Sequence, residues 1–398
     1  MPPIFRSTRY DVVVAGARCA GAATALLLAR MGMRVLVVDP SAPGSDTLST
    51  HALMRPGVLQ LHRWGVLEAI RAGGTPPVRE TTFHYGGAAV SVSIKPRDGV
   101  DALDPPRRAL LDAVLAEAAA DSGAEVVYGH SVVDIVRSTD GRVRGACIAG
   151  PGQDRVEVTA NLVIGADGLR SQVAELAGAD FDYVVRHRTA VVYGYWKGLG
   201  LDGFNWHYAS GVSVGVIPTN AGDTCVFVSI PPARFESHRR AGLDALFNDA
   251  LREASPDRAA RTADGSRSGR LRGFAGAPGF LRRSAGPGWA LVGDAGYFKD
   301  PLTAHGISDA LRDAELLARA THEGTDAALA RYQRTRDELV RPLLDVTDRI
   351  ASFDWDLESV KQHHLELSRE MNREVEFLLA LGPPPGIAGQ PRTAVGAR

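Results

Sequence analysis

Apolar residues change their spacing twice within the first forty positions of the chain. The run YDVVVA at 10–15 is almost continuously apolar, as expected for a strand buried on both faces of a parallel sheet. Small residues and leucines at 22–30 then predict a helix that ends near Gly32. The run RVLVVD at 34–39 predicts a second buried strand. Strand, tight turn, helix and strand in this order predict a βαβ unit.

The pattern after residue 100 is mixed. Leu111, Val114 and Leu115 recur at helical spacing within 108–122, and Asp140-Gly141 is a hairpin signal between two strand patterns. Strands are expected at 125–128, 132–137, 142–148, 155–159, 162–165 and 289–292. Aromatic and β-branched runs separated by Gly, Pro and Asn turns predict mostly antiparallel sheet over 181–271. Long amphipathic helices are expected at 307–323 and 327–353.

The predicted fold class is therefore α/β, with a discontinuous Rossmann-like nucleotide-binding domain, an inserted, mostly antiparallel β-sheet substrate domain, and C-terminal helices. The expected boundaries are 1–78, 101–180 and 272–350 for the nucleotide domain, 79–100 and 181–271 for the substrate domain, 351–381 for a C-terminal helix, and 382–398 for a disordered Pro/Gly tail.

Composition narrows the classes of partner. The chain has 398 residues, 45% of them apolar, and a net charge of -1, which argues against a protein built to grip nucleic acid. Three widely spaced cysteines and the absence of a signal-like or bilayer-spanning apolar run lead us to expect a cytoplasmic protein without stable membrane insertion. No metal-ligand spacing is present, so we expect no metal. A basic stretch, including Arg272, is either a solvated strip or a site for a phosphorylated nicotinamide or acidic substrate.

Three segments carry candidate chemistry. In the first, Gly16 permits a sharp turn, Gly21 allows close helix–strand packing, and Asp39 can accept hydrogen bonds from a ribose; Arg18 replaces the usual middle glycine. A glycine-punctuated structural turn is the alternative. The second segment, GADG, places Asp167 after a strand. The third runs from WALVGDA through PLTAHGI, and brings a helix N-terminus that can stabilise negative charge.

In this order, together with Arg108 in RALLD, the motifs resemble the FAD-dependent monooxygenases of the p-hydroxybenzoate hydroxylase type. The wider superfamily includes geranylgeranyl reductases and flavin halogenases, and the resemblance runs from about residue 10 to residue 350. It implies a Rossmann-like FAD-binding domain without a second dinucleotide fold. The residues that it implies for FAD are Gly16, Ala17, Arg18, Gly21, Asp39, Arg108, Asp167, Gly293, Asp294, Pro301, Gly306 and Ile307.

The resemblance implies an FAD-dependent monooxygenase. Such an enzyme uses NAD(P)H and O2 to hydroxylate or epoxidise a small aromatic or polyketide-like substrate through a flavin hydroperoxide. Arg is far more abundant than Lys, with many Ala and Gly, which is typical of a GC-rich bacterial source, and we therefore expect a setting in secondary metabolism. His51, His305 and Tyr195 are the candidate catalytic residues. Arg55, Tyr193, Trp206 and Tyr208 are the candidate substrate residues. The alternatives are an aromatic core, histidines satisfied by backbone, and an ion pair for Arg55.

Other flavin functions stay open. The segment GYFKDPLTAHGISDAL also resembles the loop of geranylgeranyl reductases, which reduce prenyl C=C bonds. A halogenase needs a lysine between flavin and substrate, and Lys299 is the candidate closest to the motif. A non-enzymatic flavin-binding protein is the third alternative. The sequence leaves open a separate flavin reductase as partner and a homodimer formed through the helices after residue 325.

Overall fold

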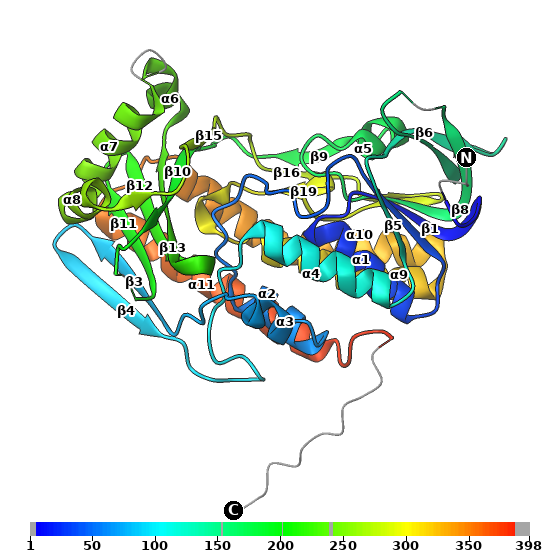
Figure 1. The fold of residues 1–398 in the computed structure, drawn as a ribbon, viewed down its shortest axis with the longest axis horizontal. Coiled ribbons are helices and arrows are strands. Elements are labelled where there is room, and N and C mark those ends of the chain that lie inside the picture. Colours follow the sequence, from blue (N-terminus) through cyan, green and yellow to red (C-terminus); the bar gives the residue numbers. More distant parts are fainter. Residues whose placement is uncertain (1–4, 153, 201, 239–241, 387–398) are drawn as a thin grey trace, which may run out of the picture.

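The computed structural model describes residues 5–152, 154–200, 202–238 and 242–386. It has two halves, each built on an eight-stranded sheet (Figure 1). The expected α/β fold class is confirmed: a nucleotide-type parallel sheet, a second sheet and C-terminal helices are all present. A small third sheet joins them, in the order β19-β16-β9; its strands are β9 (Phe181–Val184), β16 (Phe280–Arg282) and β19 (Tyr297–Phe298).

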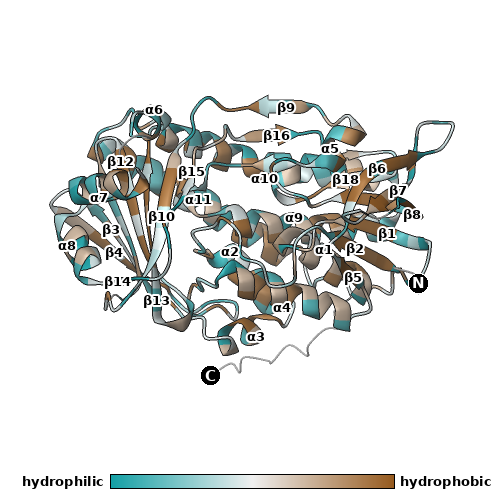
Figure 2. Cartoon of the chain, turned by 45° about the horizontal axis from the view of Figure 1, so that its top comes forward, coloured by the Kyte–Doolittle hydropathy of each residue, from teal (hydrophilic) through white to brown (hydrophobic). Residues whose placement is uncertain are grey.

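The first sheet has the order β17-β18-β8-β1-β2-β5, and β7 pairs with both β8 and β6. Its strands are β1 (Arg9–Ala15), β2 (Val35–Asp39), β5 (Glu125–Tyr128), β6 (Ser131–Arg137), β7 (Val143–Ala149), β8 (Val156–Gly165), β17 (Ala285–Gly286) and β18 (Trp289–Leu291). Strand β1 is parallel to β2 and β8, so three carboxyl ends meet at one edge. Figure 2 shows how apolar these strands are.

Alternate side chains of β1 enter two different cores. Val12 and Val14 pack against helices, whereas Val13 and Ala15 pack on the face covered by α5 and the β6–β8 meander. The near-continuous apolar run of the sequence is explained by burial on both faces. The helices of this half are α1 (Cys19–Arg30), α2 (Arg55–Arg63), α3 (Leu67–Ala72), α4 (Arg108–Asp121), α5 (Gln172–Ala177), α9 (Gly306–Glu323) and α10 (Asp326–Ala351).

The second sheet has the order β14-β10-β13-β12-β11-β3-β4, with β15 also paired to β10. Its strands are β3 (Glu80–Tyr85), β4 (Ala88–Ser93), β10 (Ala190–Lys197), β11 (Phe204–Ala209), β12 (Val212–Pro218), β13 (Asp223–Ile230), β14 (Ser266–Arg267) and β15 (Arg272–Phe274). Most pairs are antiparallel, but β3 and β11 are parallel.

Two stretches differ from the local expectations. The span expected to be mostly sheet also contains helices α6 (Pro232–Ser237), α7 (Leu243–Ala254) and α8 (Pro256–Asp264). The two strands expected at 155–159 and 162–165 are one strand, β8, whose first half alternates in burial and whose second half is fully buried. The change of pattern occurs because β8 pairs first with the antiparallel β7 and then with the parallel β1.

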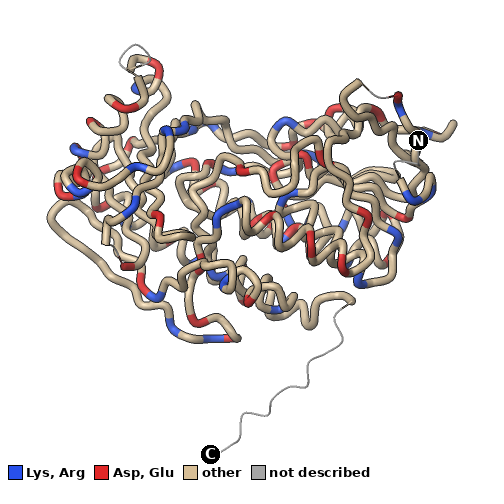
Figure 3. The backbone as a smooth tube through the Cα atoms, viewed as in Figure 1, with Lys and Arg blue, Asp and Glu red and all other residues tan. Residues whose placement is uncertain are grey.

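The chain ends with α11 (Leu357–Ala380), in orange-red in Figure 1, which runs from the second sheet toward α2. Of the tail, 382–386 are described: the Gly382 carbonyl accepts from Arg63 and Arg319, and the Pro383 carbonyl accepts from Arg319. The rest of the tail lies outside the described residues. Acidic and basic residues are interspersed over both halves (Figure 3). Within the described ranges, none of the helices combines the length and hydropathy needed to cross a bilayer.

Candidate functional site

The turn after β1 lies against the GADG turn after β8. Gly16 has φ +107°, and a Cβ placed there would lie 2.4 Å from the Ala166 carbonyl oxygen. A Cβ on Gly21 would lie 1.9 Å from the Gly16 carbonyl oxygen. Both positions therefore require glycine, one for its conformation and its close neighbour and the other for helix–strand packing.

Two acidic side chains organise the start of α1. Asp39, at the end of β2, accepts from the Ala17 N–H at 2.8 Å and is 4% exposed. Asp112 of α4 accepts from the Cys19 N–H at 3.0 Å and forms an ion pair with Arg108, also at 3.0 Å. This second contact brings the predicted FAD residue Arg108 to the α1 N-terminus. The sequence interpretation missed Asp112, although its position four residues after Arg108 was a signal.

Asp294 approaches the same edge of the sheet from a third segment. Gly293 has φ +61°, and a Cβ there would lie 2.9 Å from the Cβ of Ala20 in α1. Asp294 is an exposed residue, but protein atoms surround its carboxyl closely and limit its hydration. This desolvation raises the pKa of the carboxyl to about 6, although the positive charge of Arg108 opposes the rise. The structure therefore brings Gly16, Asp39, Arg108 and Asp294 to one edge; their contact with FAD stays a prediction.

Asp167 accepts hydrogen bonds from residues at the start of α5. It accepts from the Ser171 hydroxyl and from the N–H groups of Gln172 and Val173, the latter at 2.8 and 3.1 Å. The carboxylate thus caps the start of α5, and its predicted cofactor role stays a prediction. Arg55 donates to the backbone carbonyls of Lys95 and Val100 at 2.7 and 3.3 Å, and its predicted contact with a substrate stays a prediction.

The loop of residues 301–307 begins with Pro301 and ends at the start of α9. Ala304 has φ +53°, in the left-handed region, and is buried. Gly306 is exposed, and a Cβ placed there would meet nothing within 4 Å. The N-terminus of α9, with Gly306 and then Ile307, therefore borders open space, as a helix end that receives a ligand requires.

One face of the second sheet is aromatic and lies toward the first half. Neighbouring strands place Tyr193, Phe227 and Trp206 side by side on this face. Ala52 and Ala304 belong to the same apolar cluster, so the sheet packs against the 301–307 loop and the segment before α2. We call this surface the aromatic face; its main residues are Tyr193, Tyr195, Phe204, Trp206, Tyr208 and Phe227.

A histidine–tyrosine pair lies at the border of the aromatic face. The His51 Nε2 contacts the Tyr195 hydroxyl, and Nδ1 finds no partner among the described residues. His51 is 1% exposed and has φ +65°, an unusual backbone conformation for a non-glycine residue. Burial, with the nearby Arg107, lowers the pKa of His51 to about 3, so the imidazole is neutral at neutral pH.

Arg107 extends this pair into a charged group. Its guanidinium lies 3.7 Å from the centre of the Tyr195 ring and 2.8 Å from the Asp46 carboxylate. Arg272, from the basic stretch of the sequence, binds Asp46 at 3.1 Å. Sequence reasoning missed Asp46 and Arg107, because segments far apart in the chain bring them together.

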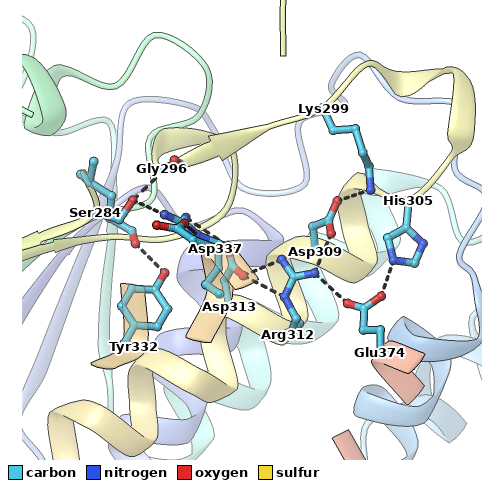
Figure 4. A network of polar contacts seen from close by, with 12 residues as sticks. Ser284, Gly296, Lys299, His305, Asp309, Arg312, Asp313, Tyr332, Asp337 and Glu374 are labelled. Carbon is cyan, nitrogen blue, oxygen red and sulfur yellow. Dashed lines mark hydrogen bonds and ion pairs between the residues drawn. The ribbon is translucent and has the colours of Figure 1, made fainter. Parts of the chain in front are cut away.

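His305 lies in a network of buried charges (Figure 4). Its side chain is fully buried, and Nε2 lies 2.5 Å from Glu374 of α11. Arg312 binds Asp309, Asp313 and Glu374, each at 2.7 Å. We call this set the buried ion network: Lys299, His305, Asp309, Arg312, Asp313, Arg336 and Glu374. The Nε2 of His305 therefore contacts a carboxylate rather than a backbone group.

Three members of the network have ligand atoms close enough for a metal ion. Atoms of His305, Asp309 and Glu374 lie within 4.8 Å of one another. However, the Lys299 ammonium lies 2.9 Å from Asp309, and Arg312 binds both carboxylates. These two cations already neutralise the site, and a metal ion would have to displace them.

The chain was compared with known proteins. Residues 9–347 match a family described as an FAD binding domain. Menaquinone reductase of Mycolicibacterium smegmatis is 27% identical over 351 residues, or 80% of this chain and 78% of that protein. Phenazine 1,6-dicarboxylic acid hydroxylase PhzS of Lysobacter antibioticus is 30% identical over 380 residues, which cover 83% of this chain and 87% of that protein. A triple mutant of the flavin-dependent brominase Bmp2 shares the fold, with TM-score 0.78, 96% coverage of each chain and 18% identity.

Proposed function

The chain belongs to the FAD binding domain family and is an FAD-dependent oxidoreductase, and we propose that it is a monooxygenase. It uses NAD(P)H and O2 to hydroxylate or epoxidise a small aromatic or polyketide-like molecule. The observation that carries this proposal is the aromatic face, which packs against the 301–307 loop. Similarity to the hydroxylase PhzS, at 30% identity, supports the same class of reaction.

The residues at the sheet edge fit FAD. Arg18 has one buried guanidinium nitrogen, Nη1, without a partner among the described residues, which a phosphate oxygen of the cofactor would satisfy. Asp39 suits the ribose, and Asp294 with Arg108 suits the ribityl and phosphate side. The open space beside Gly306 leaves room for the ring system at the α9 N-terminus. When bound, reduced FAD would supply the two electrons that activate O2; one oxygen atom of O2 would go to the substrate and the other would leave as water.

The protein's own part is to bind, orient and shield the substrate. Tyr193 and Trp206 are buried in the aromatic face, and we propose that a planar substrate binds at the edge of this face. Tyr195 and His51 form a neutral pair at the border: burial raises the pKa of the Tyr195 hydroxyl above its ordinary value, so both groups are uncharged at neutral pH. The free Nδ1 of His51 is the polar atom available to a substrate hydroxyl, and the pair can pass a proton without storing charge.

The other flavin chemistries fit less well. An unsaturated prenyl chain is a hydrocarbon and has no polar group to pair with the tyrosine hydroxyls or with the Arg107–Asp46 ion pair at this surface. The halogenase interpretation needs a lysine near the substrate, but Lys299 is 1% exposed and paired with Asp309, while Lys95 and Lys197 are exposed. Reduction remains the chemistry of the menaquinone reductase to which the chain is similar, and the experiment must separate it from oxygenation.

The test is an assay of the purified protein loaded with FAD. NAD(P)H oxidation is followed together with oxygen uptake, using a panel of phenols, naphthols and anthracyclic polyketides. Incorporation of one atom from labelled O2 into a product supports the proposal. Saturation of a double bond without oxygen uptake overturns it in favour of a reductase, and a halide-dependent mass gain overturns it in favour of a halogenase.

A further inference from the structure

Helix α11 lies outside the family-matched range of residues 9–347, yet it touches both parts of the candidate site. In its first half, His364 lies against the aromatic face: its ring centre is 4.4 Å from that of Tyr208, and Nδ1 lies 2.9 Å from the Tyr85 hydroxyl. In its second half, Glu374 reaches the 301–307 loop. One helix thus spans from the aromatic face to the buried ion network.

Glu374 uses both of its carboxylate oxygens inside the protein. Oε1 accepts from Arg312 at 2.7 Å, and Oε2 lies 2.5 Å from the His305 Nε2 (Figure 4). The side chain is 1% exposed. Burial alone would raise the pKa of Glu374, but His305 and Arg312 hold it below its ordinary value, so the carboxylate is charged.

The 301–307 loop needs support of this kind. Ala304 has φ +53°, a left-handed backbone conformation that is strained for a residue with a side chain. His305, the next residue, is the N-cap of α9 but makes no side-chain capping hydrogen bond. Its ring is held instead by Glu374, from a helix 69 residues further along the chain. The position of the α9 N-terminus therefore depends on a side chain from outside the loop, that of Glu374.

We propose that Glu374 is a positioning residue for the cofactor, which holds His305 and Arg312 so that the N-terminus of α9 receives the flavin. The inference rests on FAD binding at the 301–307 loop. It does not depend on which reaction the bound flavin performs. Glu374 touches no substrate or cofactor in this scheme and acts only through His305 and the first turns of α9.

The test compares Glu374→Gln with Glu376→Gln. Both changes are isosteric and lie on α11, but Glu376 is 58% exposed and pairs with Arg97. We expect Glu374→Gln to weaken FAD binding by roughly tenfold, the size of one lost charge-assisted hydrogen bond, and to shift the reduction potential of the bound flavin. Glu376→Gln should keep both wild-type values. A folded Glu374→Gln protein with wild-type affinity and potential overturns the proposal.

A measurement on the wild type covers the case in which Glu374→Gln does not fold. Amide hydrogen exchange is compared with and without FAD. Binding should slow exchange at 304–308 and also at 374–378, but leave 357–361 at the start of α11 unchanged. Protection confined to 304–308 overturns the proposal. A wild type that binds no FAD overturns both proposals, whereas one that binds FAD without transferring oxygen overturns only the monooxygenase.

Discussion

The side chains behind the 301–307 loop are charged, whereas those behind the aromatic face are neutral. Glu374 contacts His305 of the loop, and Lys299 and Arg312 contact Asp309 in the first turn of α9, all through short directional contacts. The far side of the second sheet instead packs on α7 through apolar side chains, with Trp196 stacked on Phe247 at 5.1 Å. Buried ion pairs specify one geometry, while apolar layers tolerate volume-conserving change. Under the proposed function, directional contacts therefore fix the half that would hold FAD, and the half that would meet the substrate tolerates changes in packing.

The largest expected effect is at the cofactor half, for Gly16→Ala. The added methyl would meet a carbonyl oxygen at 2.4 Å on a backbone with φ +107°, so we expect loss of FAD binding together with a fall in thermal stability. Gly306→Ala is the matched change, because its methyl meets no protein atom within 4 Å. It should keep the apoprotein's melting temperature and lower only FAD affinity. Equal melting temperatures for the two apoproteins would contradict the steric argument.

The next effect breaks the buried ion network. Arg312→Met leaves Asp309, Asp313 and Glu374 with fewer cations in a fully buried setting, so we expect a loss of about 3–5 kcal/mol in the free energy of unfolding. Arg349→Met is the control, since Arg349 and Glu366 form a pair in which both side chains are 44% exposed. That change should cost less than about 1 kcal/mol. Urea denaturation measures both, and similar losses would mean that burial of the network carries no special weight.

The same contrast explains what could be predicted from the sequence. The βαβ unit, Gly16, Gly21 and Asp39 follow local rules, because a turn and its flanking strands lie within a few residues of each other. The apolar spacing of α7, at Leu243, Leu246 and Phe247, is also local and was overlooked among the strand patterns.

Other features depend on the assembled fold. The sequence pattern predicts two strands where the structure has the single strand β8. The two halves of β8 have different neighbouring strands, and only the sheet order reveals this. Glu374 and Asp46 could not be found from spacing, since their partners lie in distant segments: Glu374 meets His305 and Arg312, and Asp46 meets Arg107. Buried charge was the hardest part to anticipate.

The smallest expected effect is a loss of folding stability as the pH falls, which should be larger for the second sheet than for the buried ion network. Burial lowers the pKa of His364 to about 3, so above pH 6.5 neither the folded nor the unfolded protein is protonated there, and stability is lost as the pH falls from 6.5 toward 3. At pH 5 this one histidine costs about 2 kcal/mol relative to pH 7. Burial likewise lowers to about 3 the pKa values of His51, at the border of the aromatic face, and of His207, on the opposite face of the second sheet, which adds to the loss. In the buried ion network, the pKa values of Asp309 and Glu374 are lowered from ordinary values near 4, so the network keeps its contribution down to that pH.

His364→Phe isolates the effect, because it keeps an aromatic ring beside Tyr208 and removes the titrating group. The variant should lose about 2 kcal/mol less than the wild type between pH 7 and pH 5, measured as free energies of unfolding in urea. The difference between the proteins is needed because the raised pKa of Asp294, about 6, adds a contribution of opposite sign to both. His322→Gln, at an exposed position at the end of α9, is the control for the loss of a histidine. If His364→Phe loses as much free energy of unfolding as the wild type between pH 7 and pH 5, protonation of His364 does not destabilise the protein in acid.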